Sequence, residues 1–525
     1  MPKSLSHLSL AAFALAAFAC TSLGAQEAKP ATPATTATKP ATPAEDKSAT
    51  EPKVWVTKHT VPIGGANVAY TATIGTLAIR NEKDEVVAHY GFTAYVKDAV
   101  KDGADARTRP IMFAYNGGPG SSSVWLHMGI LGPKRTVIND LDFNSRGPFR
   151  MVDNEYSILD KSDLVMVDPI GTGFSRVVGK GEGKDHWGVD QDAKSVSKFI
   201  VTYLGKYNRW ASPKFILGES YGGMRSGAVS YELLSKHNVA LNGVVLVSPF
   251  MDFGAGGWNL MTINSDVNFL TTYAATAWYH KAIANRPAEL QPFLREVEKF
   301  AREVYAMTLL KGHRATPAER QATLEGLAKY TGISADYWDK SNLRMSEGRF
   351  LQELLRNKGE VGGRVDSRYT GGNINPLSER MKYDPYTASV APAIAATFND
   401  YMRRDLKVET EREYAFSGDL WRSWDFTHTQ PSTGFKSPVP NTADDLMHAM
   451  TMNPKMKVLI QQGYFDLAVP YGTIEFVVDQ MHLSPKVRSN IAFEYYEAGH
   501  MMYVHPASMV KFKKDLAGFV EAHSR

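Results

Sequence analysis

A serine, an aspartate and a histidine each follow an apolar segment of this 525-residue chain, and their types and spacing fit covalent catalysis. Ser220 lies in Gly218-Glu-Ser-Tyr-Gly222, directly after the run Lys-Phe-Ile-Leu at 214–217. A serine on a sharp turn between a strand and a helix needs neighbours without a Cβ, so that its hydroxyl stands clear of the backbone. The pentapeptide nominates Ser220 as a nucleophile, although by itself it fits an ordinary strand-turn-helix equally well.

A hydroxyl nucleophile requires a general base, and the base requires an acid that orients it and stabilises its positive charge. Asp466 follows the apolar segment 458–460, and His500 follows 491–496. Taken alone, such an aspartate is more often a loop acid or helix cap, and such a histidine is more often structural. The order Ser, Asp, His is nevertheless that of α/β-hydrolases, whose sites lie at the carboxyl ends of strands. We therefore predict a catalytic triad of Ser220, Asp466 and His500.

A glycine-rich segment, Asn-Gly-Gly-Pro-Gly-Ser-Ser-Ser at 116–123, follows another apolar segment. Acyl transfer develops negative charge on a carbonyl oxygen, and backbone N–H groups freed by glycines can converge on that charge. We expect the donors to be the N–H groups of Gly118 and of Tyr221, the residue after the nucleophile. A phosphate-binding loop is the competing interpretation, but the segment lacks the Lys-Ser/Thr ending of such loops.

The elements that must position these residues follow two patterns. Alternating segments at 68–79 and 86–96, joined by a turn at 81–84, predict an antiparallel hairpin at one sheet edge. After them, short apolar strands separated by helical sequence predict a parallel sheet. These strands are expected at 111–115, 164–167, 215–217, 244–247, 458–460 and 491–496, with a closing helix at 507–522.

The interval 253–442 lacks this alternation and is rich in amphipathic helical sequence, for example at 287–310 and 316–330. We interpret it as a largely helical cap inserted into an α/β core of residues 54–252 and 443–525. The predicted fold class is α/β, of the α/β-hydrolase type, with a central, mostly parallel sheet flanked by helices.

The N-terminal residues 1–25 combine Lys3, an apolar stretch and small residues, which is typical of a cleavable export signal. Residues 26–53 are rich in Ala, Pro and Thr and predict a disordered tether. We expect a periplasmic or secreted protein without a transmembrane span in its mature chain. Lipid attachment at Cys20, the single cysteine, is a less favoured alternative because Ala17 replaces the usual larger aliphatic residue.

The amino-acid composition narrows the classes of function that this protein could have. Apolar residues make up 43% of the chain and charged residues 22%, as in soluble globular proteins. The formal net charge of +4 is spread without long basic runs, so nucleic-acid binding gains no support. Metal-ligand spacings such as His-Glu-x-x-His are absent from the sequence, and we expect neither a metal nor another cofactor.

The combined motifs resemble the serine carboxypeptidases. The resemblance is carried, in order, by Asn116-Gly-Gly-Pro-Gly-Ser-Ser-Ser123, Val167-Asp-Pro-Ile-Gly-Thr-Gly-Phe-Ser175, Gly218-Glu-Ser-Tyr-Gly-Gly223 and Gly499-His-Met501. It implies removal of the C-terminal residue of a peptide through an acyl-enzyme, with Ser220 attacking, His500 moving the proton and Asp466 orienting the imidazole. It also implies that Asn116, Gly117 and Glu219 bind the terminal carboxylate of the substrate and that Met501 lines the leaving-residue pocket.

Glu219 would repel a bound carboxylate unless one of the pair carries a proton. Burial and a second anion both raise a carboxyl pKa, so we expect peptide affinity to weaken as pH rises. The sequence also departs from the family here, because Ile130 stands where a glutamate usually shares a hydrogen bond with the binding glutamate. His127 is close enough in sequence to compensate, although an ordinary core or surface histidine is the simpler interpretation. Ser121 and Val469 stand where the family often has cysteines.

Two alternatives to a carboxypeptidase remain open. An esterase or acyltransferase would use the same triad on the same scaffold, and the loss of the glutamate at Ile130 favours it. A catalytically inactive binding protein would retain the fold for recognition alone. The complete set of Ser220, Asp466, His500 and Gly118 argues against this second alternative. The preferred substrate residue and the oligomeric state are not readable from the sequence.

Overall fold

The computed structural model describes residues 51–98, 106–256 and 262–524. The predicted export signal at 1–25, Cys20 and the predicted tether up to residue 50 lie outside the described residues. Across the part of the chain that is described, no helix is both long and apolar enough to cross a membrane.

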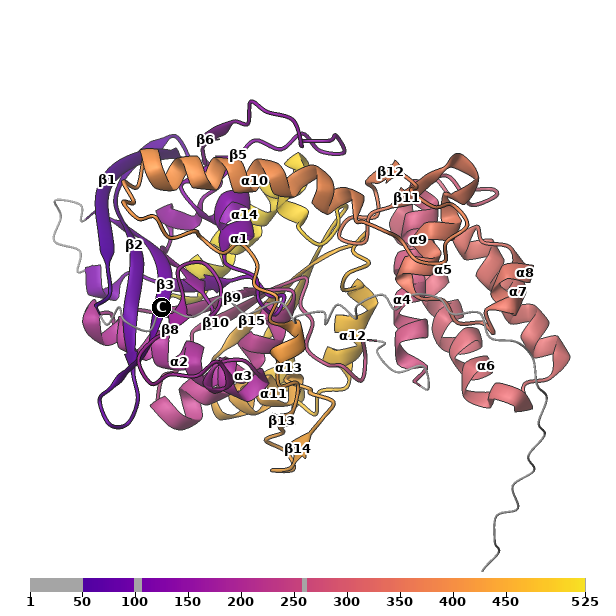
Figure 1. Ribbon diagram of the computed structural model, residues 1–525. Helices are drawn as coiled ribbons and strands as arrows, with labels where there is room; N and C mark the ends of the chain where they lie inside the picture. The colour runs from indigo at the N-terminus through magenta and orange to yellow at the C-terminus, as the bar shows by residue number, and fades with distance from the viewer. Residues whose placement is uncertain (1–50, 99–105, 257–261, 525) are drawn as a thin grey trace, which may run out of the picture. The chain divides into compact units, whose positions relative to one another are not determined.

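The largest sheet of the described residues is a mixed sheet of ten strands, several of which are labelled in the left half of Figure 1. Its order is β1-β2-β3-β7-β4-β9-β10-β15-β16, with β8 paired to β3. The bounds are β1 Val54–Ile63, β2 Ala66–Arg80, β3 Val86–Lys97, β4 Ile111–Tyr115, β7 Asp163–Asp168, β8 Arg176–Val177, β9 Lys214–Glu219, β10 Gly243–Val247, β15 Lys457–Gly463 and β16 Ile491–Tyr496. The six neighbouring strands β7, β4, β9, β10, β15 and β16 run parallel to one another, which confirms the predicted α/β fold class.

The antiparallel end of the sheet has two strands that the sequence did not predict, the outer strand β1 and the short strand β8, which pairs with β3. The hairpin expected at 68–79 and 86–96 is present as β2 and β3, but β1 pairs along β2 and forms the outer edge. In β1, alternate residues are exposed and most of the others are only half-buried. A strand that buries so little of one face has a weak hydrophobic pattern, which explains why the sequence did not reveal it.

The inner parallel strands β7, β4, β9, β10 and β15 are buried on both faces, whereas the edge strand β16 is partly exposed. Side chains of the inner strands alternate between two hydrophobic cores. In β4, Ile111, Phe113 and Tyr115 join one core, which is completed by α2 (Val189–Lys206), α3 (Tyr221–His237) and α11 (Ala443–Met452). Met112 and Ala114 join the other core, with α10 (Pro385–Arg404) and α14 (Pro506–His523). Helices on both faces leave the carboxyl ends of the strands free to carry a site.

The helices between β10 and β15 form most of a third hydrophobic core. This core is built mainly from α4 (Asn264–Tyr279), α5 (Leu290–Phe300), α6 (Ala306–Lys311), α7 (Pro317–Thr331), α8 (Ala335–Lys340) and α9 (Glu347–Leu354). Helix α10, although it belongs to the same interval of sequence, packs with the sheet strands instead. Tyr464 and Phe465, which follow β15, also pack into the third core, so this helical group contacts the chain next to Asp466.

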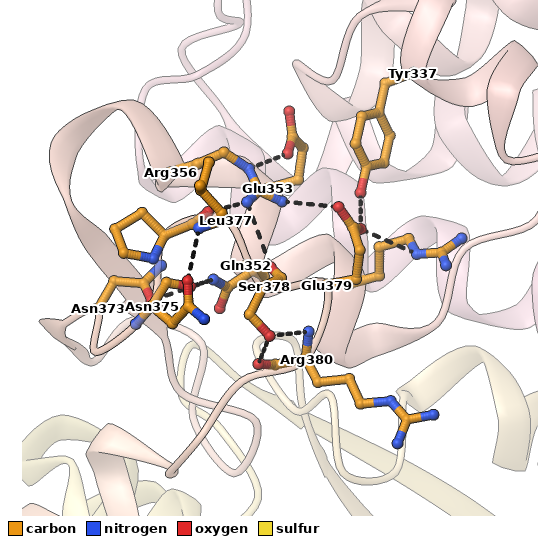
Figure 2. A network of polar contacts seen from close by, with 12 residues as sticks. Tyr337, Gln352, Glu353, Arg356, Asn373, Asn375, Leu377, Ser378, Glu379 and Arg380 are labelled. Atoms are coloured by element: carbon orange, nitrogen blue, oxygen red, sulfur yellow. Dashed lines mark hydrogen bonds and ion pairs between the residues drawn. The ribbon is translucent and has the colours of Figure 1, made fainter. Parts of the chain in front are cut away.

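Polar contacts fasten the loop after β12 (Thr370–Gly372) to helix α9 (Figure 2). The guanidinium of Arg356 pairs with Glu353 at 2.5 Å and with Glu379 at 3.3 Å. Gln352 Nε2 donates to the carbonyl of Asn375 at 2.9 Å. The network therefore holds the loop against α9, whose first residue, Glu347, lines the cavity described below, as does Arg364 after β11 (Glu360–Gly362).

Candidate active site

Ser220 occupies a sharp turn between β9 and α3. Its backbone has φ 63° and ψ −126°, a region that non-glycine residues rarely adopt. The N–H of Ser220 donates to the carbonyl of Val247 at 3.0 Å, which anchors the turn to β10. A Cβ at Gly218 would collide with the carbonyl of Gly222 and the hydroxyl of Ser226, so this close turn requires glycine. Backbone strain of this kind, held by its surroundings, is typical of nucleophile elbows.

His500 and Asp466 meet at the carboxyl ends of β16 and β15. His500 Nδ1–H donates to Asp466 Oδ2 at 2.7 Å, and Asp466 Oδ1 accepts the N–H groups of Ala468 and Val469 at 2.9 Å each. Burial lowers the pKa of His500, but the adjacent Asp466 carboxylate outweighs burial and the net shift is upward. The hydrogen bond leaves Nε2 of the imidazole as the free nitrogen, the one that a base needs for proton transfer.

A segment of the insertion holds the histidine loop in place. The N–H of His500 donates to the carbonyl of Val365 at 2.7 Å, and the N–H of Gly499 donates to Asp366 Oδ2 at 3.0 Å. Asp366 is itself paired with the buried Arg368 at 2.6 Å. Sequence reasoning did not find these positioning residues, because they lie more than a hundred residues before His500 and carry no local motif.

The glycine-rich segment fits closely against the elbow. A Cβ at Gly117 would collide with the backbone nitrogen of Tyr221, and Gly118 has φ +106°, so both positions demand glycine. Asp168, from the second motif of the sequence, accepts hydrogen bonds from the N–H and hydroxyl of Ser123 at 2.9 and 2.7 Å. These contacts place the second motif against the glycine-rich segment, and the glycine-rich segment against the elbow.

A cavity of about 700 Å³ borders the serine and the histidine. Of the predicted site residues, Gly118, Ser220, Tyr221 and His500 line it, whereas Asp466, Asn116, Gly117, Glu219 and Met501 lie outside its wall. Much of the remaining wall is apolar, from Phe250, Phe253, Phe269, Trp421 and Val469. A charged pair, Arg364 and Glu347, also faces the cavity. The cavity combines a nucleophile, a base and backbone donors with an apolar surface for a ligand.

Glu219 is buried beside the elbow and has two hydrogen-bond donors. Asn116 Nδ2 donates to Oε1 at 2.8 Å, and the hydroxyl of Tyr503 donates to Oε2 at 2.7 Å. Burial raises the pKa of Glu219 to about 7, against the opposing effects of His500 and the two hydrogen bonds. Ile130, which stands where the family usually has a glutamate, is buried in the apolar core. The hydrogen-bond partner that Glu219 was expected to lack is supplied by Tyr503 instead.

His127 does not compensate for the glutamate that Ile130 replaces. It is buried, its Nε2 shares a 2.6 Å hydrogen bond with the hydroxyl of Tyr95, and burial lowers its pKa to about 3. It is therefore an ordinary core histidine, as the simpler interpretation expected. Tyr503 lies three residues after His500 and shows no sequence signal beyond that proximity.

A serine elbow with a hydrogen-bonded histidine and buried aspartate, all at the carboxyl ends of a mostly parallel sheet, is typical of the α/β class of serine hydrolases. Within that class, a match to a family model identifies the family. The family model described as serine carboxypeptidase matches residues 68–523, and the chain belongs to this family.

Individual relatives match over shorter segments. Serine carboxypeptidase-like 3 of Arabidopsis thaliana is 30% identical over 186 residues, which are 33% of this chain and 38% of the relative. The pheromone-processing carboxypeptidase KEX1 of Saccharomyces cerevisiae is 35% identical over 150 residues, 27% of this chain and 19% of the relative. Both matches therefore span less than half the length of the relative.

The fold extends further than these segments. The crystal structure of KEX1(delta)p, a prohormone-processing carboxypeptidase from Saccharomyces cerevisiae, superposes with a TM-score of 0.52 at 15% identity. The superposition covers 87% of this chain and 91% of that chain. A likeness at this identity establishes a shared fold.

Proposed function

We propose that this protein is a serine carboxypeptidase that hydrolyses the C-terminal peptide bond of its substrates. The observation that carries the proposal is the 2.7 Å hydrogen bond between His500 and Asp466 at a cavity that Ser220 also lines. Family membership supports the same reaction and the same roles.

The reaction follows from these groups. Ser220 Oγ attacks the scissile carbonyl while His500 Nε2 takes the hydroxyl proton, and the N–H groups of Gly118 and Tyr221 stabilise the oxyanion. His500 then gives the proton to the leaving amine, which departs as the free terminal residue and leaves an ester on Ser220. Water, deprotonated by His500, hydrolyses that ester and restores the serine. Asp466 holds the imidazole in the required orientation and stabilises the imidazolium.

Recognition of the free terminus is assigned to Asn116, Gly117 and Glu219, with Met501 in the leaving-residue pocket. The position of Glu219 directly before Ser220, and its pKa of about 7, support this assignment. A protonated Glu219 can donate a hydrogen bond to a substrate carboxylate, whereas the ionised form repels it. The substrates are accordingly peptides with a free C-terminus.

An esterase or acyltransferase is the second candidate. It is favoured by the placement of Asn116, Gly117 and Glu219 outside the cavity wall, with Asn116 and Glu219 hydrogen-bonded to each other. An enzyme without a terminal-carboxylate site would still acylate Ser220 from an ester.

The test is release of free amino acids from N-blocked dipeptides and from their amidated counterparts, with Ser220→Ala as the control. A carboxypeptidase releases amino acids with a preference for the free carboxylate, and Ser220→Ala abolishes the release. Ester cleavage without peptide cleavage establishes the second candidate instead. If a fluorophosphonate fails to label Ser220, neither enzyme is present and the fold serves binding alone.

We also propose that the protein is exported, with a signal at 1–25 and a tether at 26–53 that leads to an α/β core of 54–252 and 443–525 and a cap of 253–442. N-terminal sequencing of the mature protein tests cleavage near residue 25. Retention of Cys20 with bound lipid would favour the lipid-anchored alternative.

A further inference from the structure

Two side chains of opposite charge, Arg364 and Glu347, face the mainly apolar cavity beside Ser220 and His500. Both come from the insertion: Glu347 begins α9, and Arg364 follows β11. The catalytic steps derived above use neither residue. Phe250, Phe269 and Trp421 line the same cavity, and a charge in a partly apolar cavity interacts more strongly with a ligand than the same charge on an open surface.

The backbone of Arg364 is fixed against the catalytic loops. Its N–H donates to Asp384 Oδ2 at 2.6 Å, and its carbonyl accepts from the N–H of Leu467 at 3.1 Å. The carbonyl of the next residue, Val365, accepts from the N–H of His500. The side chain of Arg364 therefore starts from a defined point next to Asp466 and His500, and its charge acts to lower the pKa of His500.

The guanidinium itself is loosely paired. Arg364 Nε lies 3.7 Å from Glu347 Oε1, too far for a hydrogen bond, and the Arg364 side chain is 44% exposed. Glu347 lies in the first turn of α9, where the helix dipole stabilises its negative charge independently of Arg364. The wall of the cavity consequently offers unused N–H donors on a cation, a group suited to a carboxylate.

We propose that Arg364 is a specificity-determining residue that selects an acidic side chain on the substrate residue bound in this cavity. The aromatic wall accommodates the methylene part of a Glu side chain while the guanidinium pairs with its carboxylate. The proposal rests on the proposed peptidase function, and it concerns a substrate side chain rather than the terminal carboxylate.

The experiment compares N-blocked dipeptides that carry Glu, Gln or Leu on either side of the scissile bond. Values of kcat/KM are measured for the wild type, Arg364→Gln, Arg364→Lys and Glu347→Gln. The matched control is Arg349→Gln, which removes an arginine of the same insertion that is 40% exposed and paired with Glu379 at 3.3 Å outside the cavity wall.

At one of the two positions, the wild type should prefer Glu over Gln by about fivefold, the effect of one partly exposed ion pair. Arg364→Gln should abolish that preference, Arg364→Lys should retain part of it, and Glu347→Gln should increase it by removing the competing anion. Arg349→Gln should leave it unchanged, and cleavage of the Leu peptides should persist in every variant.

Equal cleavage of Glu and Gln peptides by the wild type overturns the proposal, as does a Glu preference that survives in Arg364→Gln. A loss in Arg364→Gln that is equal for Glu, Gln and Leu peptides and absent for amidated ones overturns it too, because Arg364 would then bind the terminal carboxylate. If no peptide is cleaved at all, the proposed function fails. Calorimetric binding of the Glu and Gln peptides to Ser220→Ala, with and without Arg364→Gln, then decides the role of Arg364 separately.

Discussion

The hydrogen bond between His500 and Asp466 makes a carboxylate the partner of the base. Asp466→Asn keeps the shape of the side chain but removes the charge, and an amide in that position favours the wrong imidazole tautomer. We expect kcat to fall by about 10³- to 10⁴-fold, as for the equivalent change in other Ser-His-Asp enzymes.

Unfolding by urea should be little altered in Asp466→Asn, which separates the catalytic loss from a folding defect. A variant with near wild-type kcat would show that Asp466 is not the acid that orients His500.

We expect Glu219 to determine the pH dependence of peptide affinity. Its pKa of about 7 means that it is protonated, and able to bind a carboxylate, at acidic pH, and ionised above neutrality. We expect KM for a free-carboxylate peptide to rise as pH increases through about 7, and KM for the amidated peptide to lack that rise.

Tyr503 provides an internal check on this assignment. Its hydrogen bond lowers the pKa of Glu219, so Tyr503→Phe should move the rise in KM to higher pH, and Glu219→Gln should remove it. Identical pH profiles of KM for free and amidated peptides would remove Glu219 from carboxylate recognition.

Among the elements, the glycine-rich segment and the elbow fit together only because Gly117 has no side chain. In Gly117→Ala the new Cβ must displace the backbone at Tyr221. We expect a loss of about 1–3 kcal/mol in the free energy of unfolding from this overpacking. The displaced N–H groups should also lower kcat by about 100-fold.

Gly518→Ala is the matched control for this change. Gly518 lies inside α14, and a Cβ there meets nothing within 4 Å. This substitution should stabilise the protein by about 0.5–1 kcal/mol, because alanine is the better helix residue, and leave kcat unchanged. Equal effects of the two substitutions, measured by urea unfolding and kcat, would contradict the close contact at Gly117.

For the whole molecule, one buried histidine joins three distant segments. His428 in β13 (His428–Thr429) contacts Asp190 of α2 at 2.6 Å and Asp445 of α11 at 2.7 Å. Burial lowers the pKa of His428, but the two carboxylates outweigh burial and raise it to about 9. Because the folded pKa lies above the unfolded value, the stabilisation is complete below the unfolded pKa and is lost as pH rises through about 9.

Urea unfolding of the wild type and of His428→Gln checks this dependence. The wild type should exceed the variant by about 1–3 kcal/mol near pH 6, and the difference should shrink toward pH 10. Lys436→Gln removes an exposed cation that is paired with Asp425 at 3.4 Å next to β13, and it should have little effect. A difference that is constant over this pH range would mean that His428 acts through packing alone.

The sequence by itself determined the α/β fold class and the order of the parallel strands along the chain. Hydrophobic patterns and glycine turns are local, so β4 and β16 were expected with the bounds that they have, and β9 and β15 were located although both extend beyond the expected 215–217 and 458–460. The same local signals pointed to Ser220 and to Asp466 and His500, which lie in the loops after β15 and β16.

Only the tertiary structure decided what surrounds these residues. Tyr503 reaches Glu219 across 284 positions of sequence, and Val365 holds His500 from within the insertion. Arg364 lines the cavity from the segment after β11, and β1 pairs along β2. Such contacts depend on how separate segments pack together, and they produce no hydrophobic periodicity in the sequence of either segment alone.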